Sequence, residues 1–275
     1  MAADRINVNR MVFIGAGNMA EALVKGMLAG GVCTADRLCV TDVRPERLAF
    51  FEKEFNVKGL TSNENAVRSA DVVVLAVKPQ VIGGVLDGFQ TAFGHKPLVI
   101  SIAAGISTSW LENSLGEGVR VVRAMPNTPA LVRSGATAIC RGRWATDADF
   151  SFAEAMLSAV GVVVRIEEKD MDAVTALSGS GPAYVFHLME AMIAAASHAG
   201  LDDGVARKLV YATVRGAAKL AEDTGADPAE LRRRVTSKGG TTEAALAVLE
   251  EKSVYHAYLQ AIAAAHRRAQ ELSGG

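Results

Sequence analysis

A short glycine-containing loop constrains this chain more than any other feature of its sequence. Residues 15–20 read Gly-Ala-Gly-Asn-Met-Ala, directly after the apolar run Met11–Ile14 and at the start of a helical pattern. The first glycine of such a loop permits a tight turn, the second lets the backbone approach a ligand closely, and a small last residue keeps the helix near the sheet. The N–H groups at the start of a helix bind phosphate. We therefore predict that Gly15, Ala16, Gly17, Asn18, Met19 and Ala20 receive the pyrophosphate of a nicotinamide dinucleotide.

Apolar and helical segments alternate through the first half of the chain, which predicts a parallel sheet with right-handed crossovers. A strand buried on both faces is a continuous apolar run, as in residues 72–77, Val-Val-Val-Leu-Ala-Val. The expected fold class is α/β, with an N-terminal Rossmann-type parallel sheet domain. The expected strands are Met11–Ile14, Leu38–Thr41, Asp71–Val77, Leu98–Ala103 and Val119–Ala124, with two weaker candidates, Thr137–Cys140 and Gly161–Ile166.

After Lys169 the strand patterns stop, alanine becomes abundant, and the remaining sequence is typical of helices. A chain of 275 residues is long enough for two domains. We predict an NAD(P)-binding Rossmann domain over 1–168 and an all-α domain over 169–275 that binds substrate and forms dimers. The segment Pro182–Ala199 is apolar on nearly all sides, so a helix there needs complete burial, and a second subunit is the simplest cover. The expected helices are Asp170–Leu177, Pro182–Ala199, Asp203–Thr224, Pro228–Val235, Thr242–Glu251 and Val254–Leu272.

The residues after the second expected strand bear on the choice of cofactor. Asp42 stands where a carboxylate accepts hydrogen bonds from the adenosine ribose hydroxyls and repels a 2′-phosphate, which favours NADH. Arg44 opposes this, because its guanidinium could stack on adenine or hold a 2′-phosphate bidentately. Arg44 could instead pair on the surface with Glu46 or Glu52. The sequence favours NADH, and we expect both NADH and NADPH to work.

Further cofactor contacts are expected where other strands end, because ligands bind at the carboxyl ends of strands in open α/β sheets. Two such ends carry residues 76–80 and 101–105, and the small side chains of the second leave room for a nicotinamide ribose. Lys78 could also be an ordinary surface lysine. Asn63 is expected to cap a helix and could reach the adenosine ribose. The residues predicted here are Asn63, Ala76, Val77, Lys78, Pro79, Ala103, Ala104 and Gly105.

Charge and cysteine content argue against several other classes. The formal net charge is −1, so nothing electrostatic favours a nucleic acid or an acidic membrane as a partner. The three cysteines and five histidines show no metal-ligand spacing, and we predict no metal site. Residues 1–10 lack the apolar core of a signal peptide, and polar residues interrupt the most apolar window, Pro182–Ala199. We expect a cytoplasmic protein.

Six segments of the chain occur in an order that resembles one enzyme family. They read IGAGNMAEAL, AVKPQ, SIAAGI, MPNTP, SGSGPAY and SKGGTTEAAL. From Met11 to about Leu272, the chain resembles pyrroline-5-carboxylate reductase, the enzyme of the last step of proline biosynthesis. The resemblance implies reduction of the cyclic imine 1-pyrroline-5-carboxylate to L-proline by hydride from NADPH or NADH. It also implies an N-terminal Rossmann domain and a helical domain that interlocks into dimers, which often assemble into larger rings.

The resemblance also assigns roles to residues. It implies that Ser237, Gly239, Gly240 and Thr241 bind the substrate carboxylate and that Thr242 hydrogen-bonds the ring nitrogen, with the nicotinamide coming from the other part of the dimer interface. Two glycines followed by threonines at a helix start make an anion-binding N-terminus, although they also make an ordinary capped turn. Many family members carry proline where this chain has Lys238, which we expect to face water. Ser180, Met125, Pro126 and Asn127 are expected to line the cleft near the nicotinamide, with Ser180 and Thr242 as the catalytic candidates.

The absence of a proton-donating side chain distinguishes this predicted function from its main alternative, a β-hydroxy-acid dehydrogenase. Reduction of a ketone needs a proton donor for the developing alkoxide, and those enzymes use a lysine shortly after a glycine-rich turn. The corresponding stretch here, residues 179–186, contains no lysine. A cyclic imine can arrive already protonated, so the protein need only hold the ring and the nicotinamide in register. A non-enzymatic sensor of the nicotinamide redox state is the remaining alternative.

Overall fold

The structure is a computed structural model that describes residues 8–274, so the expectation about the N-terminal stretch lies largely outside the described residues. The chain divides into two compact units. The first contains the residues up to Ser180 together with those from Ala265 onward, and the second is Gly181–Ala264. This division differs from the domain boundary that we expected after residue 168. Residues 169–180 stay with the first unit, and so does the C-terminal end of the last helix.

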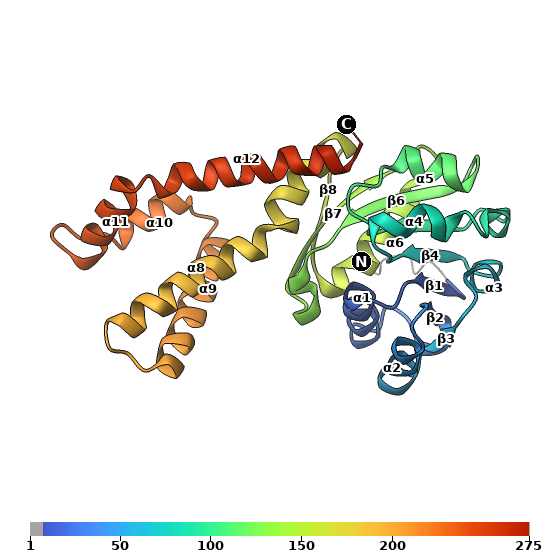
Figure 1. The fold of residues 1–275 in the computed structure, drawn as a ribbon, viewed down its shortest axis with the longest axis horizontal. Helices are drawn as coiled ribbons and strands as arrows, with labels where there is room; N and C mark the ends of the chain where they lie inside the picture. The colour runs from blue at the N-terminus through green and yellow to red at the C-terminus, as the bar shows by residue number, and fades with distance from the viewer. Residues whose placement is uncertain (1–7, 275) are drawn as a thin grey trace. The chain divides into compact units, whose positions relative to one another are not determined.

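The first unit is built on an eight-stranded sheet in the order β3-β2-β1-β4-β5-β6-β7-β8 (Figure 1). All neighbouring strands run parallel except β6 and β7, so the expected parallel sheet is confirmed and contains one antiparallel pair. Only residues 126–134 join these two strands, and a parallel crossover needs a dozen residues or more. The strands are β1 Met11–Ile14, β2 Leu38–Thr41, β3 Lys58–Leu60, β4 Val72–Leu75, β5 Leu98–Ser101, β6 Arg120–Met125, β7 Gly135–Arg141 and β8 Gly161–Arg165.

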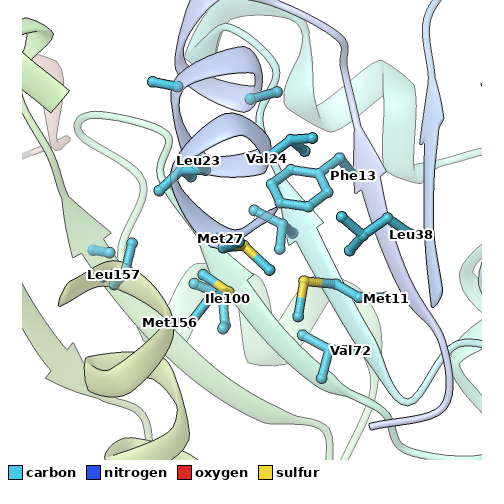
Figure 2. Packing of buried hydrophobic residues seen from close by; sticks show 14 of the residues in the cluster. Met11, Phe13, Leu23, Val24, Met27, Leu38, Val72, Ile100, Met156 and Leu157 are labelled. Carbon is cyan, nitrogen blue, oxygen red and sulfur yellow. The ribbon is translucent and has the colours of Figure 1, made fainter. Parts of the chain in front are cut away.

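Helices cover both faces of this sheet, and side chains of β1 alternate between the two faces. Met11 and Phe13 pack with residues of α1, α2 and α6, whereas Val12 and Ile14 pack with residues of α3, α4 and α5. Figure 2 shows Leu23, Val24 and Met27 of α1 gathered around the first pair. Two enclosed apolar clusters therefore hold the sheet rigid beneath its carboxyl edge. The helices are α1 Asn18–Ala29, α2 Pro45–Phe55, α3 Asn63–Val67, α4 Pro79–Leu86, α5 Thr108–Leu115, α6 Asp147–Leu157 and α7 Met171–Val174.

The second unit consists of helices, and it buries very little of its own apolar surface. The helices are α8 Gly181–His198, α9 Asp203–Thr224, α10 Pro228–Arg234, α11 Thr241–Glu251 and the first part of α12 Val254–Leu272. These agree closely with the expected ranges. Asp227 caps α10, because its side chain accepts the Ala229 N–H at 2.7 Å. Only Ala206 and Val210 are buried apolar residues in this unit, and α8 has none. The helix that we expected over Asp170–Leu177 is instead split between α7 and a π-helical turn, Thr175–Gly179.

Two further features concern residues 8–274 as a whole. No helix in this range is long and apolar enough to cross a membrane. Nor do three or more His, Cys, Asp or Glu side chains of these residues gather into a group that could hold a metal ion.

Candidate functional site

The loop after β1 has the geometry that its glycines predict. Gly15 has a φ of +98°, and a Cβ there would lie 2.7 Å from the Ala76 carbonyl oxygen, so no other residue fits without strain. Gly17 is the N-cap residue of α1, and a Cβ built on it meets nothing within 4 Å. The tight turn at Gly15 and the open approach at Gly17 are confirmed as backbone features. Their contact with a pyrophosphate stays a prediction.

A cavity of about 460 Å³ lies beside this loop, at the carboxyl edge of the sheet. Its wall combines the open start of α1 with the ends of β4 and β5, and it carries three cationic side chains. The uncapped first turn of α1 supplies N–H groups, and the open space over Gly17 is a cradle that fits a phosphate group. The lining residues are Gly17, Asn18, Met19, Arg44, Arg47, Ala76, Val77, Lys78 and Ile102.

Two of these residues, Arg47 and Ile102, are not among the predicted contacts. Arg47 lies in the first turn of α2, three residues after Arg44, which is the N-cap residue of that helix and not part of it. The closeness of Arg47 to Arg44 in the sequence was the available signal for it. Ile102 follows β5 within residues 101–105, where we expected small side chains to leave room for a nicotinamide ribose. Of these five residues, Ile102 is the one that lines the cavity.

The peptide groups on both sides of Ala16 are held by side chains from the β2–α2 region. Asp42 Oδ2 accepts the Ala16 N–H at 2.9 Å, and Arg47 Nε donates to the Ala16 carbonyl oxygen at 2.7 Å. Arg47 is fixed in turn by an ion pair with Glu21 at 2.8 Å, and its guanidinium lies over the Phe50 ring, 4.7 Å from the ring centre. The loop is therefore preorganised for a ligand.

Asp42 and Arg44 form an ion pair, so the surface pairing of Arg44 with Glu46 or Glu52 is wrong. Arg44 donates its backbone N–H at 2.9 Å and Nε at 3.0 Å to Asp42 Oδ1, and Nη2 at 3.2 Å to Oδ2. Burial raises the pKa of the Asp42 carboxyl, but hydrogen bonds from Arg44 and from Ala16 outweigh it and hold that pKa below its ordinary value. The same pair raises the pKa of Arg44. Asp42 is therefore ionised, and its charge is matched by Arg44.

Other predicted cofactor residues lie beneath or beside the cavity. Ala16, Ala20 and Ala103 are buried in the core, where small side chains allow α1 and the sheet to approach each other. Gly105 has a φ of +75°, and a Cβ there would lie 2.9 Å from the Leu272 carbonyl oxygen. Close packing against the end of α12 therefore explains why this position is a glycine. Ala104 and Pro79, the first residue of α4, are likewise absent from the cavity wall.

The cap of α3 differs from the expectation. Asn63 is the first residue of this helix, as expected, but the N-cap is Ser62, whose Oγ accepts the Asn65 N–H at 3.2 Å. A serine oxygen one position earlier reaches the third helical N–H, which leaves the Asn63 side chain without a capping role. Its contact with a ribose stays a prediction.

The loop after β6 contacts the π-helical turn that precedes Ser180. Asn127 Nδ2 donates to the Ser178 carbonyl oxygen at 3.0 Å, and its Oδ1 accepts a backbone N–H from β7 at 2.9 Å. A Cβ on Gly179 would lie 2.6 Å from the Met125 methyl carbon. The structure thus brings residues 125–127 and 178–179 together, as their expected position at one cleft requires. π-turns of this kind are frequent at functional sites.

In the second unit, the loop before α11 is closed by its own hydrogen bonds. The Gly239 N–H donates to Glu243 Oε2 at 2.7 Å, and the Gly240 N–H donates to the Ser237 carbonyl oxygen at 3.0 Å. Gly239 has a φ of +71°, where glycine is strongly favoured. Both glycine N–H groups that we expected to bind a carboxylate therefore already have acceptors. Lys238 is exposed.

The start of α11 remains open to a ligand. Its N-cap residue, Gly240, makes no side-chain capping bond, and the first hydrogen bond of the helix runs from the Ala244 N–H to the Gly240 carbonyl oxygen. The N–H groups of Thr241 and Thr242 therefore have no acceptor within the helix. These N–H groups, two threonine hydroxyls and the positive end of the helix dipole make an anion-binding position.

Comparison with known proteins covers nearly the whole chain. A family model described as pyrroline-5-carboxylate reductase dimerisation matches residues 168–272, and one described as NADP oxidoreductase coenzyme F420-dependent matches residues 10–105. A pyrroline-5-carboxylate reductase of Pseudomonas aeruginosa is 44% identical over 265 residues, which is 96% of this chain and 97% of the relative.

Solved structures extend this similarity to the fold. A pyrroline-5-carboxylate reductase from Coxiella burnetii superposes with a TM-score of 0.90 at 42% identity, covering 97% of this chain and 99% of that one. A pyrroline carboxylate reductase from Plasmodium falciparum with NADP bound gives a TM-score of 0.88 at 30% identity, covering 97% of this chain and 98% of that one.

Proposed function

This chain belongs to the pyrroline-5-carboxylate reductase family, and from that premise we propose that it reduces 1-pyrroline-5-carboxylate to L-proline with NADPH or NADH. The single observation that supports this most strongly is that one chain carries two sites. One is a dinucleotide cradle at the edge of a sheet, and the other is an open helix start suited to a small carboxylate.

The first unit holds the cofactor in this proposal. The start of α1, with Gly17, Asn18 and Met19 on the cavity wall, binds the pyrophosphate through backbone N–H groups, while Lys78, which also lines the cavity, adds positive charge. Asp42 and Arg47 keep the Ala16 peptide in place, so the loop loses little entropy on binding. When bound, the nicotinamide supplies the hydride.

The second unit holds the substrate carboxylate. The N–H groups of Thr241 and Thr242, together with the Ser237 hydroxyl, are the donors assigned to it, because the glycine N–H groups of the loop are already bonded. The glycines then serve to shape the turn. The Thr242 hydroxyl is assigned to the ring nitrogen, which it holds by a hydrogen bond.

The chemistry asks little further of the protein. A protonated imine is already electrophilic, and accepting a hydride neutralises its charge, so no side chain has to donate a proton in this step. The protein must still orient the ring and exclude water. In the first unit, we assign this role to Ser180 and to the loop of residues 125–127, which is held to the turn before Ser180 by Asn127. A β-hydroxy-acid dehydrogenase would need an acid that residues 179–186 do not offer.

The dimerisation domain makes this protein a homo-oligomer. We extend the proposal to a homodimer formed through the helical unit, with a larger ring of dimers as the further state that the resemblance implies. Light scattering decides between the mass of two subunits and a larger multiple. All three cysteines are free thiols, as is usual in a reducing compartment, which supports a cytoplasmic location.

A direct assay tests the function. Purified protein is incubated with 1-pyrroline-5-carboxylate and either NADPH or NADH, and cofactor oxidation is followed by absorbance while proline is measured separately. We expect oxidation matched one to one by proline. Oxidation of neither cofactor overturns the proposal, and reduction of NAD⁺ by a β-hydroxy acid would support the rival enzyme. Tight cofactor binding with no turnover of any imine would support a sensor.

A further inference from the structure

The pair Asp42 and Arg44 carries an inference about which dinucleotide is selected, and it rests on the proposed function above. The expectation that Asp42 binds the ribose requires a carboxylate with free lone pairs. Its two oxygens instead accept four hydrogen bonds, one from Ala16 and three from Arg44. A carboxylate offers about four lone-pair positions, so Asp42 is saturated. Its side chain is only 8% exposed.

Arg44 is placed differently, because its side chain is 52% exposed and lines the cavity. Two of its nitrogens, Nε and Nη2, face Asp42. Within residues 8–274, no hydrogen bond engages Nη1, so this edge of the guanidinium is available to a ligand. Asp42 thus aligns a planar donor group at the cavity wall, and such a group suits a phosphate.

The net charge of the side chains around the cavity also favours a ligand with an additional phosphate. Arg44 is paired with Asp42, and Arg47 is paired with Glu21. Lys78, the third cation on the wall, has no ion-pair partner among the described residues. The ionisable side chains at this site therefore sum to one positive charge, which favours the dinucleotide with the additional phosphate.

We propose that Arg44 is the residue that determines specificity for NADPH by binding its 2′-phosphate, and that Asp42 is a positioning residue that aligns Arg44 and holds the Ala16 peptide. This reverses the preference for NADH that the sequence suggested. The carboxylate at the end of β2 does not repel the 2′-phosphate, because its charge and its lone pairs are already used within the protein.

Calorimetric titration with NADP⁺ and NAD⁺ tests this without any turnover. The unaltered protein should bind NADP⁺ at least tenfold more tightly than NAD⁺, the gain of about one charge-assisted bidentate contact. Arg44→Ala should weaken NADP⁺ binding about tenfold and leave NAD⁺ binding equal or stronger, because Asp42 regains free lone pairs. Arg44→Lys should fall between, since lysine keeps the charge but loses the planar fork.

Two further variants complete the test. Asp42→Asn keeps an acceptor for Ala16 but loosens Arg44, so NADP⁺ binding should weaken about threefold while NAD⁺ binding stays within twofold. Arg68→Ala is the control, because Arg68 is exposed and pairs only with Glu64 on α3. Equal or tighter binding of NAD⁺ by the unaltered protein would overturn the proposal, as would an unchanged ratio in a folded Arg44→Ala protein. Failure of imine reduction alone would reject the proposed function and leave this binding result intact.

Discussion

The two units of this chain differ in how much of their apolar surface a single chain can cover. The first encloses a large apolar cluster on each face of its sheet, and its largest buried side chains are almost completely inaccessible. The second buries only Ala206 and Val210 and leaves large apolar side chains exposed along α8, α9, α11 and α12. The first unit is thus complete within one chain, whereas the second needs a partner of the same kind, in agreement with its match to a dimerisation domain.

The largest effect should come from placing a charge on the exposed apolar surface of the second unit. Leu209 of α9 is 54% exposed in the single chain. Leu209→Asp should convert the oligomer to monomers and lower activity at least a hundredfold, because covering this surface would bury an unpaired carboxylate. Light scattering and the reductase assay measure both. Asp223→Asn, at an exposed position paired only with Lys219, is the control. If Leu209→Asp remained an active oligomer, the claim that the second unit needs a partner subunit to cover its apolar surface would be wrong.

The first unit should depend instead on contacts inside one chain. Glu168 accepts hydrogen bonds from the Thr108 N–H at 2.7 Å and from Arg123 Nη1 at 3.1 Å, and the Arg123 side chain is only 5% exposed. Glu168→Ala leaves that buried guanidinium unpaired and should cost about 3 kcal/mol of stability. Denaturant titration measures this. The neighbouring Glu167→Ala loses only an exposed pair with Lys169 and should be neutral. Equal effects of the two would contradict the prediction.

A smaller effect should follow from the carboxylate that closes the loop before α11. Glu243→Gln keeps an acceptor for the Gly239 N–H but removes a negative charge near the expected substrate carboxylate. It should lower the KM for the imine about twofold. Glu243→Ala also removes the acceptor and should raise that KM about fivefold. Neither variant should change cofactor binding, and Glu250→Gln, at an exposed position on the same helix, is the control. Unchanged imine KM values in both variants would contradict this assignment.

The smallest effect concerns the cysteines, all of which lie in the first unit. Burial raises the pKa of Cys140 to about 12 and that of Cys33 to about 11, and it also raises that of Cys39. A raised thiol pKa means less reactive thiolate, so at pH 8 the Cys140 thiol is almost entirely protonated. Iodoacetamide should therefore label the folded protein hardly at all and label all three thiols in denaturant. Rapid labelling of Cys140 in the folded protein would show that the first unit opens.

Much of the fold could be predicted from the sequence because the relevant signals are local. The β1 and β2 strands and the long helices of the second unit follow from uninterrupted apolar runs and from clear caps such as Asp227. The short strand β3 carries no such run, since its residues are Lys58, Gly59 and Leu60. The reversal at β7 depends on the length of the preceding loop, which strand patterning alone does not reveal.

The site was harder to predict because it depends on contacts between segments far apart in the chain. The glycine turn at residue 15 is a backbone property and could be read directly. Whether Asp42 meets a ribose or Arg44 depends on which hydrogen bonds form around one carboxylate, and several arrangements fit the same residues. Similarly, the Glu243 contact with Gly239 competes with a ligand for the same donor.

The central claim is that cofactor affinity belongs to the first unit and substrate affinity to the second. Steady-state titration of both substrates in Gly17→Ala and Thr242→Val tests it most directly. Gly17→Ala places a methyl group in the phosphate cradle and should raise the KM for NADPH at least tenfold, with the KM for the imine within twofold. Thr242→Val should raise the KM for the imine at least tenfold and leave NADP⁺ binding unchanged. Weakening of NADP⁺ binding by Thr242→Val as large as that by Gly17→Ala would contradict the claim.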